Sequence, residues 1–289
     1  MESNIGYSNL LDLAFNDAQS FRMQTDAIAN ELLLNADRKK LLKNSLSLLD
    51  ITTLQDNDYR DSLVKIISQS TYNVDGREDV VAGICIYSNL LPVLNELEVD
   101  KRIKKVVVSG GFPTGQLSLV AKLNDVAFAV EKGADEIDVP INRGLFFENP
   151  KELTIELEAI KSIVNQSNGK GVKLKVILET SELKNYRNVY NASMLAMQAG
   201  ADFIKTSTGK VSRGADIYSS YVMMAAIKDF MAENPDRKVG FKAAGGIRQC
   251  DQVLQYYCLM QYFFGKEYIN KDTFRIGCSS LINEIINNI

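Results

Sequence analysis

Histidine is missing from this chain of 289 residues, and tryptophan is missing as well. Without an imidazole, the chain cannot contain a Ser-His-Asp or Cys-His catalytic pair, an HExxH zinc site or a two-histidine iron site. Any acid–base chemistry must therefore be carried out by Asp, Glu, Lys, Tyr, Cys or the backbone.

Cysteine is scarce, and its four positions form no CxxC motif: Cys85, Cys250, Cys258 and Cys278. A disulfide scaffold or a cysteine metal site is therefore disfavoured, and we expect no metal. The first fifteen residues carry no basic residue ahead of their apolar stretch, which is unlike a secretory signal. Free thiols fit a reducing compartment, so we expect a cytoplasmic protein.

Long apolar runs and a strong excess of one charge are also missing. The longest apolar runs have the length of a strand, as in Val80–Tyr87, so we expect no membrane partner. The chain has 33 Lys and Arg against 36 Asp and Glu, a formal charge of −3, which argues against general nucleic-acid binding. With 46% hydrophobic and 24% charged residues, the composition is that of a globular protein with a sizeable core.

Beyond about residue 45, short β-rich runs alternate with longer amphipathic stretches. Eight runs are predicted as strands: Leu48–Leu54, Val80–Tyr87, Lys104–Ser109, Asp135–Pro140, Val172–Glu179, Asp202–Ser207, Lys238–Ala243 and Thr273–Gly277. A doubly wound sheet shares this alternation, but eight β-α units favour a single barrel. We therefore expect an α/β fold, a TIM-type (β/α)8 barrel over residues 46–289 with an N-terminal helical extension over residues 1–45.

Two local patterns support this organisation. The apolar positions from Ile217 to Met231 share one helical face before Pro235 ends the helix. Gly133-Ala134-Asp135 and Gly200-Ala201-Asp202 each predict a left-handed glycine at a helix end, followed at once by a strand.

The polar residues near the ends of the predicted strands are the candidates for chemistry, because barrel active sites form there. Asp138, Lys175, Lys205 and Lys242 occupy such positions. If Lys205 and Lys242 both point into the barrel from neighbouring strands, each ammonium group meets a like charge in a desolvated setting. Both effects lower a lysine pKa and favour a nucleophilic amine that forms a Schiff base.

A static ion network is the alternative, in which one lysine pairs with Asp138 or Glu179. Asp138 is a candidate acid–base group beside the lysines, although a lone Asp more often caps a helix or forms an ion pair. Asp50, at the first strand, offers the same two alternatives. Cys85 lies in an apolar strand and is expected to be a small core residue.

Three glycine- and serine-containing turns follow the last three strands and predict a phosphate site. They are Ser207-Thr208-Gly209-Lys210, Gly245-Gly246-Ile247-Arg248 and Gly277-Cys278-Ser279-Ser280. Glycines let backbone N–H groups approach an anion, and barrels often bind phosphate at these loops. Because the GxxxxGK[ST] spacing is absent, Lys210 is not a P-loop lysine.

The residues around both lysines resemble the deoxyribose-phosphate aldolase family. The resemblance rests on Phe203–Lys210, on Gly240-Phe241-Lys242 with Gly245-Gly246, and on four shorter matches: Cys85-Ile86-Tyr87, Phe112–Gly115, Glu136–Val139 and Glu179–Leu183. It extends from about Leu49 to Ile285, and Ile141-Asn142-Arg143 and Asn188-Val189-Tyr190 are similar to the longer, animal-type members. Gly111 and Ser88 depart from it, since many members have Asn and Pro there.

This resemblance implies a cofactor-free class I aldolase that reversibly cleaves 2-deoxy-D-ribose 5-phosphate to acetaldehyde and D-glyceraldehyde 3-phosphate. It implies that Lys205 forms the Schiff base, Lys242 lowers its pKa and Asp138 drives proton transfer. It further implies substrate-binding positions at Asp50, Cys85, Lys175, Thr208, Gly209, Lys210, Gly245, Gly246, Arg248, Gly277, Ser279 and Ser280.

The expected partners are a small phosphorylated sugar, an aldehyde and further copies of the chain in a homodimer or homotetramer. Two alternatives stay open at this stage. One is a Schiff-base aldolase for another phosphorylated sugar, and the other is a phosphosugar-binding barrel without catalysis.

Overall fold

Eight parallel strands close into a barrel in the computed structural model, which describes residues 7–167 and 171–289. Around the barrel the order is β1-β10-β9-β8-β7-β6-β5-β4, and β1 pairs with both β10 and β4. The barrel strands are β1 (Leu49–Thr52), β4 (Gly83–Tyr87), β5 (Lys104–Val108), β6 (Glu136–Pro140), β7 (Lys173–Ile177), β8 (Phe203–Lys205), β9 (Gly240–Ala244) and β10 (Phe274–Cys278). All eight predicted strands are present, and the TIM-type (β/α)8 fold is confirmed.

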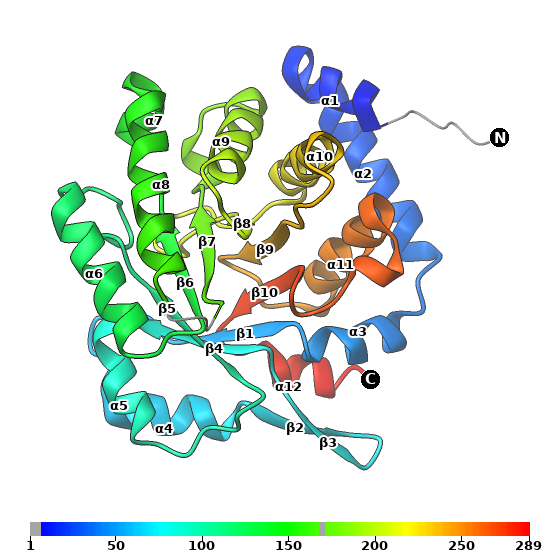
Figure 1. Cartoon of the computed structure of the whole chain (residues 1–289). Helices are drawn as coiled ribbons and strands as arrows, with labels where there is room; N and C mark the ends of the chain where they lie inside the picture. The colour runs from blue at the N-terminus through cyan, green and yellow to red at the C-terminus, as the bar shows by residue number, and fades with distance from the viewer. Residues whose placement is uncertain (1–6, 168–170) are drawn as a thin grey trace.

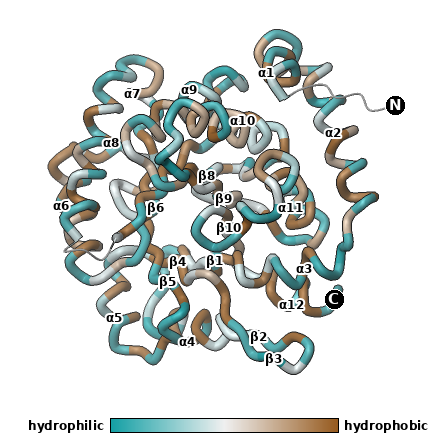
Figure 2. Tube along the Cα trace, turned by 45° about the vertical axis from the view of Figure 1, so that its right-hand side comes forward, coloured by the Kyte–Doolittle hydropathy of each residue, from teal (hydrophilic) through white to brown (hydrophobic). Residues whose placement is uncertain are grey.

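Helices surround the barrel, as Figures 1 and 2 show from two sides. They are α4 (Arg60–Ser68), α5 (Leu91–Asn95), α6 (Leu119–Glu131), α7 (Arg143–Glu148), α8 (Pro150–Asn165), α9 (Tyr186–Gln198), α10 (Ile217–Glu233), α11 (Cys250–Phe264) and α12 (Leu281–Ile286), with short 3-10 turns at Ser88–Leu90, Thr180–Glu182 and Lys266–Tyr268. Their inward faces and the outward faces of the strands form the main apolar core. Among the described residues, none of the helices is both long and apolar enough to cross a membrane.

Three helices precede the barrel: α1 (Tyr7–Asn16), α2 (Ala18–Leu34) and α3 (Arg38–Leu46). In Figure 1, α1 and α2 lie outside α10 and α11, at the right of the barrel. Phe21 of α2 is fully buried there, with its ring in edge contact with Tyr186 and Tyr221. The predicted N-terminal helices are therefore present and share a core with the barrel helices, while residues 1–6 lie outside the described part.

One element was not predicted from the sequence. The run Val80–Tyr87 is not one strand, because Val80 ends a two-stranded hairpin of β2 (Thr71–Val74) and β3 (Arg77–Val80), and β4 begins at Gly83. The hairpin turns at Asp75-Gly76, both with positive φ, which is the geometry of a tight two-residue hairpin turn. The barrel strand is therefore three residues shorter than predicted at its N-terminal end.

The repeated glycine pattern has the expected geometry. Gly133 and Gly200 have φ angles of 89° and 99°, and each follows the end of a helix. The next residue of each repeat, Ala134 or Ala201, donates its N–H to a carbonyl of the preceding helix. Each repeat thus closes a helix and leads directly into β6 or β8.

Candidate active site

The interior of the barrel holds charged side chains where apolar layers are usual. A small apolar cluster of the described residues is separate from the main core, made of Leu54, Cys85, Val106 and Val108. Beside this cluster lie four cations and three carboxylates, none more than 3% exposed: Lys175, Lys205, Lys242, Arg275, Asp50, Glu136 and Asp138. A barrel centre filled in this way has to satisfy every one of these charges internally.

Strand register places Lys205 and Lys242 next to each other. Lys205 of β8 is the register partner of Lys242 of β9, and both side chains are buried. Both Nζ atoms donate to the same oxygen, Asp138 Oδ2, at 2.8 and 2.9 Å. The two ammonium positions expected from the sequence therefore meet on one carboxylate.

Gly240 permits this packing. It is the register partner of Phe203, and a Cβ at position 240 would lie 2.2 Å from the Phe203 ring. The ring thus lies directly against the backbone of β9. A larger residue at position 240 would displace Phe203 and the strand that carries Lys205.

The other carboxylates of the barrel complete a continuous network. Lys242 also pairs with Asp50 at 2.5 Å, and Lys175 pairs with Glu136 at 2.5 Å and with Asp138 Oδ1 at 2.9 Å. Arg275 of β10 bridges Asp50 and Glu136. The structure therefore contains both arrangements considered from the sequence. Lys205 and Lys242 are adjacent, and both are also part of an ion network.

The charges of this network shift the pKa values of its acidic and basic groups in opposite directions. Burial alone would raise the pKa of Asp138, but the three lysines outweigh it and hold that pKa well below its usual value. Burial alone would lower the pKa of Lys242, but Asp138 and Asp50 outweigh it and raise that pKa above its usual value. Both groups are therefore ionised at neutral pH.

A cavity of about 310 Å³ opens above Lys205 and Lys242 at the C-terminal ends of the strands. Ten predicted residues line it: Lys205, Lys242, Thr208, Gly209, Lys210, Gly245, Gly246, Arg248, Gly277 and Ser279. The loops after β8, β9 and β10 thus meet at one mouth, as the sequence predicted.

The remaining predicted residues lie outside this lining. Asp138, Asp50 and Lys175 are below it in the ion network, and Cys85 is in the small apolar cluster, where burial raises the pKa of its thiol. Ser280, just before α12, faces a neighbouring cavity together with Ser279.

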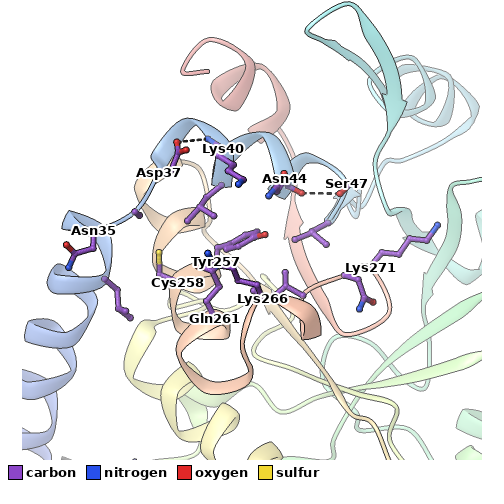
Figure 3. Close-up of a pocket in the computed structure, with 16 residues that line it drawn as sticks. Asn35, Asp37, Lys40, Asn44, Ser47, Tyr257, Cys258, Gln261, Lys266 and Lys271 are labelled. Carbon is purple, nitrogen blue, oxygen red and sulfur yellow. Dashed lines mark hydrogen bonds between the residues drawn. The ribbon is translucent and has the colours of Figure 1, made fainter. Parts of the chain in front are cut away.

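At least three larger cavities lie elsewhere in the described part of the chain, so size does not identify the site. The one in Figure 3, about 710 Å³, lies between α2, α3 and α11 near the N-terminal ends of β1 and β10. None of the residues predicted to bind substrate lines it. A groove of about 680 Å³ lies between α2 and the loops after β7, β8 and β9, and of the predicted residues only Gly245 and Gly246 reach it.

Three charged residues near the site were not proposed as site residues from the sequence. Glu136 and Arg275 belong to the ion network, and strand alternation could have found them, since each lies two residues before a chosen position, Asp138 or Gly277. Glu179, at φ 55°, accepts hydrogen bonds from the backbone and hydroxyl of Thr208, and burial raises the pKa of Glu179. It therefore holds the loop that carries Thr208.

Comparison with known proteins gives a consistent result. Residues 96–256 match the model of the DeoC/LacD family of aldolases. The chain is 37% identical to the deoxyribose-phosphate aldolase of Mus musculus, with 84% of this chain and 79% of the mouse protein covered. It is 36% identical to the Homo sapiens enzyme, with the same coverage.

A solved structure shares the fold. It is the tetrameric deoxyribose phosphate aldolase of Aeropyrum pernix, with a TM-score of 0.65 and 24% identity, covering 91% of this chain and 98% of that chain.

Proposed function

Because this chain belongs to the DeoC/LacD aldolase family, we propose that it is a deoxyribose-phosphate aldolase, a lyase that works through a Schiff base on Lys205. It reversibly cleaves 2-deoxy-D-ribose 5-phosphate to acetaldehyde and D-glyceraldehyde 3-phosphate. The observation that carries this proposal is the position of Lys205 beside Lys242 on a shared carboxylate, at the floor of the cavity.

The reaction follows from the chemistry of a buried amine. The uncharged Lys205 Nζ attacks C1 of the open-chain sugar, and loss of water gives an iminium ion. When the C3 hydroxyl loses its proton, the C2–C3 bond breaks and its electron pair moves toward the iminium nitrogen, which leaves an enamine. D-glyceraldehyde 3-phosphate departs, the enamine takes a proton at C2, and water releases acetaldehyde.

Lys242 and Asp138 support these steps from beside Lys205. Lys242 stays protonated between Asp50 and Asp138, and its charge disfavours a second ammonium ion at Lys205. Asp138, with its oxygens 2.8–2.9 Å from all three lysines, is placed to pass protons directly or through a bound water.

The phosphate of the sugar binds at the mouth of the cavity. Gly245 and Gly246 both have positive φ and offer backbone N–H groups, while Lys210, Arg248 and Ser279 line the same cavity. Lys210 is held in place because its Nζ donates to the carbonyl of Leu54 at 2.5 Å. This places the aldehyde end of the substrate toward Lys205.

Trapping the covalent intermediate tests the proposal. The full chain is incubated with acetaldehyde or with 2-deoxy-D-ribose 5-phosphate, reduced with borohydride and mapped by peptide mass spectrometry. We expect an ethyl adduct on Lys205 and no adduct at that position in Lys205→Arg. An adduct-free Lys205 in the unaltered chain contradicts the proposal and supports a phosphosugar-binding barrel without catalysis.

The substrate is tested by kinetics. We expect 2-deoxy-D-ribose 5-phosphate to give the highest kcat/KM among pentose and hexose phosphates. Faster cleavage of another sugar phosphate would reassign the chain to a different Schiff-base aldolase activity.

We further propose that the enzyme is a cytoplasmic homo-oligomer, a dimer or a tetramer. All four cysteines are free, buried thiols, which fits a reducing compartment. Five large apolar side chains are exposed on neighbouring segments from Leu117 to α8, and such a patch fits a subunit interface. They are Leu117, Leu119, Val120, Phe147 and Ile155.

A further inference from the structure

The positive and negative charges of the seven ionisable side chains inside the barrel do not cancel when all of them are ionised. Four cations, Lys175, Lys205, Lys242 and Arg275, face three carboxylates, Asp50, Glu136 and Asp138. The fully ionised network therefore carries one positive charge in excess, in a place almost closed to water. An uncompensated buried charge is costly, and losing a proton from one lysine removes it.

The contacts show which lysine is the least compensated. Lys175, Lys242 and Arg275 each pair with two carboxylates. Among the residues that the structure describes, Lys205 pairs with one carboxylate, Asp138, and it shares that carboxylate with Lys175 and Lys242. Arginine keeps its proton at every relevant pH, so Lys205 is the least compensated of the three lysines that could lose one.

Arg275 creates this shortage without touching Lys205. It is fully buried and engages both Asp50 and Glu136, the second partners of Lys242 and Lys175. Because those carboxylates are shared with Arg275, Lys242 and Lys175 depend more strongly on Asp138. Less of the charge of Asp138 is then available to Lys205.

We propose that Arg275 and Glu136 are positioning residues that set the protonation state of Lys205 through the shared carboxylates. This inference rests on the proposed Schiff-base function and deepens it. Arg275 favours the uncharged amine by adding a permanent cation to the network, and Glu136 opposes it by adding an anion.

Other ionisable groups near Lys205 leave the net charge of its surroundings unchanged. Burial raises the pKa of the Cys85 thiol on β4, so this group stays neutral. Glu179, after β7, lies near Arg143 of α7, and these two charges offset each other. The groups that face Lys205 are thus those of the network on β1, β6, β7, β9 and β10, together with Cys85 and Glu179.

The first test is the pH dependence of kcat/KM for Arg275→Met. With this cation removed, three protonated lysines balance three carboxylates, so Lys205 keeps its proton to higher pH. We expect the acid limb of the profile to move up by about one pH unit or more, with activity recovering at alkaline pH. The pH dependence of Schiff-base formation with acetaldehyde is expected to move by the same amount.

Glu136→Gln provides the opposite change. Removing this anion is expected to move the acid limb to lower pH. The double variant Glu136→Gln/Arg275→Met again has one cation in excess, and its limb is expected to return toward that of the unaltered chain. A role in packing alone would not produce this compensation.

A matched control is Lys122→Met. Lys122 is fully buried and pairs with Glu156 at 2.5 Å between α6 and α8, outside the barrel. Its loss is expected to lower stability without moving the acid limb.

Two outcomes overturn the inference. In the first, Arg275→Met lowers the rate by one factor at every pH. In the second, the acid limb of the kcat/KM profile of Glu136→Gln does not move. This outcome is decisive where Arg275→Met does not fold. If the unaltered chain forms no adduct on Lys205, the proposed function itself fails, whereas an adduct with unmoved limbs contradicts only the charge-balance inference.

Discussion

Asp138 is the residue on which the barrel network depends most. It is fully buried, and its two oxygens accept hydrogen bonds from Lys175, Lys205 and Lys242. Breaking a buried ion pair by removing one partner typically costs about 3–5 kcal/mol, because the other charge stays behind without water. One carboxylate therefore supports both the stability of the barrel and the placement of the reactive amine.

Asp138→Asn is expected to lower stability by about 3–5 kcal/mol and kcat by about 10²–10⁴-fold. Its stability should also respond less to acid. The folded pKa of Asp138 lies below that of an unfolded aspartate, about 3.9, so its contribution is complete above that pH and is lost as the pH falls further.

Denaturant unfolding between pH 2 and pH 7 measures this difference. The unaltered chain should lose stability more steeply below about pH 4 than the variant does. Parallel curves for the two proteins would show that Asp138 is not the source of the acid sensitivity.

Single residues could be predicted from the sequence where a motif or a strand end marked them. Lys205, Lys242 and Asp138 fall at such places, and the structure brings them together. Strand alternation could have placed Arg275 and Glu136 in the barrel interior, but it could not have identified their partners, because these depend on the register across strands distant in sequence. Arg275 meets Asp50, 225 residues away, only because the barrel closes between β10 and β1.

Two loops at the active-site mouth pack backbone to backbone. A Cβ at Gly214 would lie 2.2 Å from the carbonyl oxygen of Gly245, and Ala215 donates its N–H to the carbonyls of Ala244 and Gly245. The loop after β8 therefore supports the glycine turn after β9, which lines the cavity. No side chain larger than hydrogen fits at position 214 without moving that turn.

Gly214→Ala tests this support. We expect the added methyl group to displace the Gly245 turn, which should raise KM for the sugar phosphate by about tenfold and cost about 1–3 kcal/mol of stability. Steady-state kinetics and thermal unfolding measure both effects. Gly144→Ala, in α7, is the matched control and should leave KM unchanged, while equal KM values in all three proteins would contradict the supporting role.

At the scale of elements, the number of barrel strands and their order along the chain followed from the sequence, but two features did not. The break between Val80 and Gly83 is invisible in an unbroken apolar run, so the hairpin β2–β3 was missed. The helix from Ile217 was expected to have one apolar face, yet every residue of Ser219–Ile227 is buried in α10. Packing by α1 and α2 on its outer side explains this, and periodicity within one helix cannot reveal it.

At the scale of the molecule, the exposed apolar side chains from Leu117 to α8 bear on assembly. Val120 on α6 is 69% exposed and Ile155 on α8 is 61% exposed, and α6 packs on α8. A charged residue in this patch would be buried without a partner if the patch is a subunit interface.

Val120→Asp is therefore expected to shift the chain toward a smaller species in light scattering. Val64→Asp is the matched control, since Val64 is also an exposed valine but lies on α4. If both variants keep the mass of the unaltered protein, the interface lies elsewhere or the chain is a monomer.

The hairpin β2–β3 is a suitable place to insert a tag or a second domain into this protein. It leaves the barrel between α4 and β4, at the end opposite the catalytic cavity, and projects at the bottom of Figures 1 and 2. Its Asp75-Gly76 turn is exposed, and loop tips of this kind tolerate insertions best. An affinity tag or a fluorescent domain inserted there would immobilise or report on the enzyme while leaving the mouth of the barrel open to its substrate.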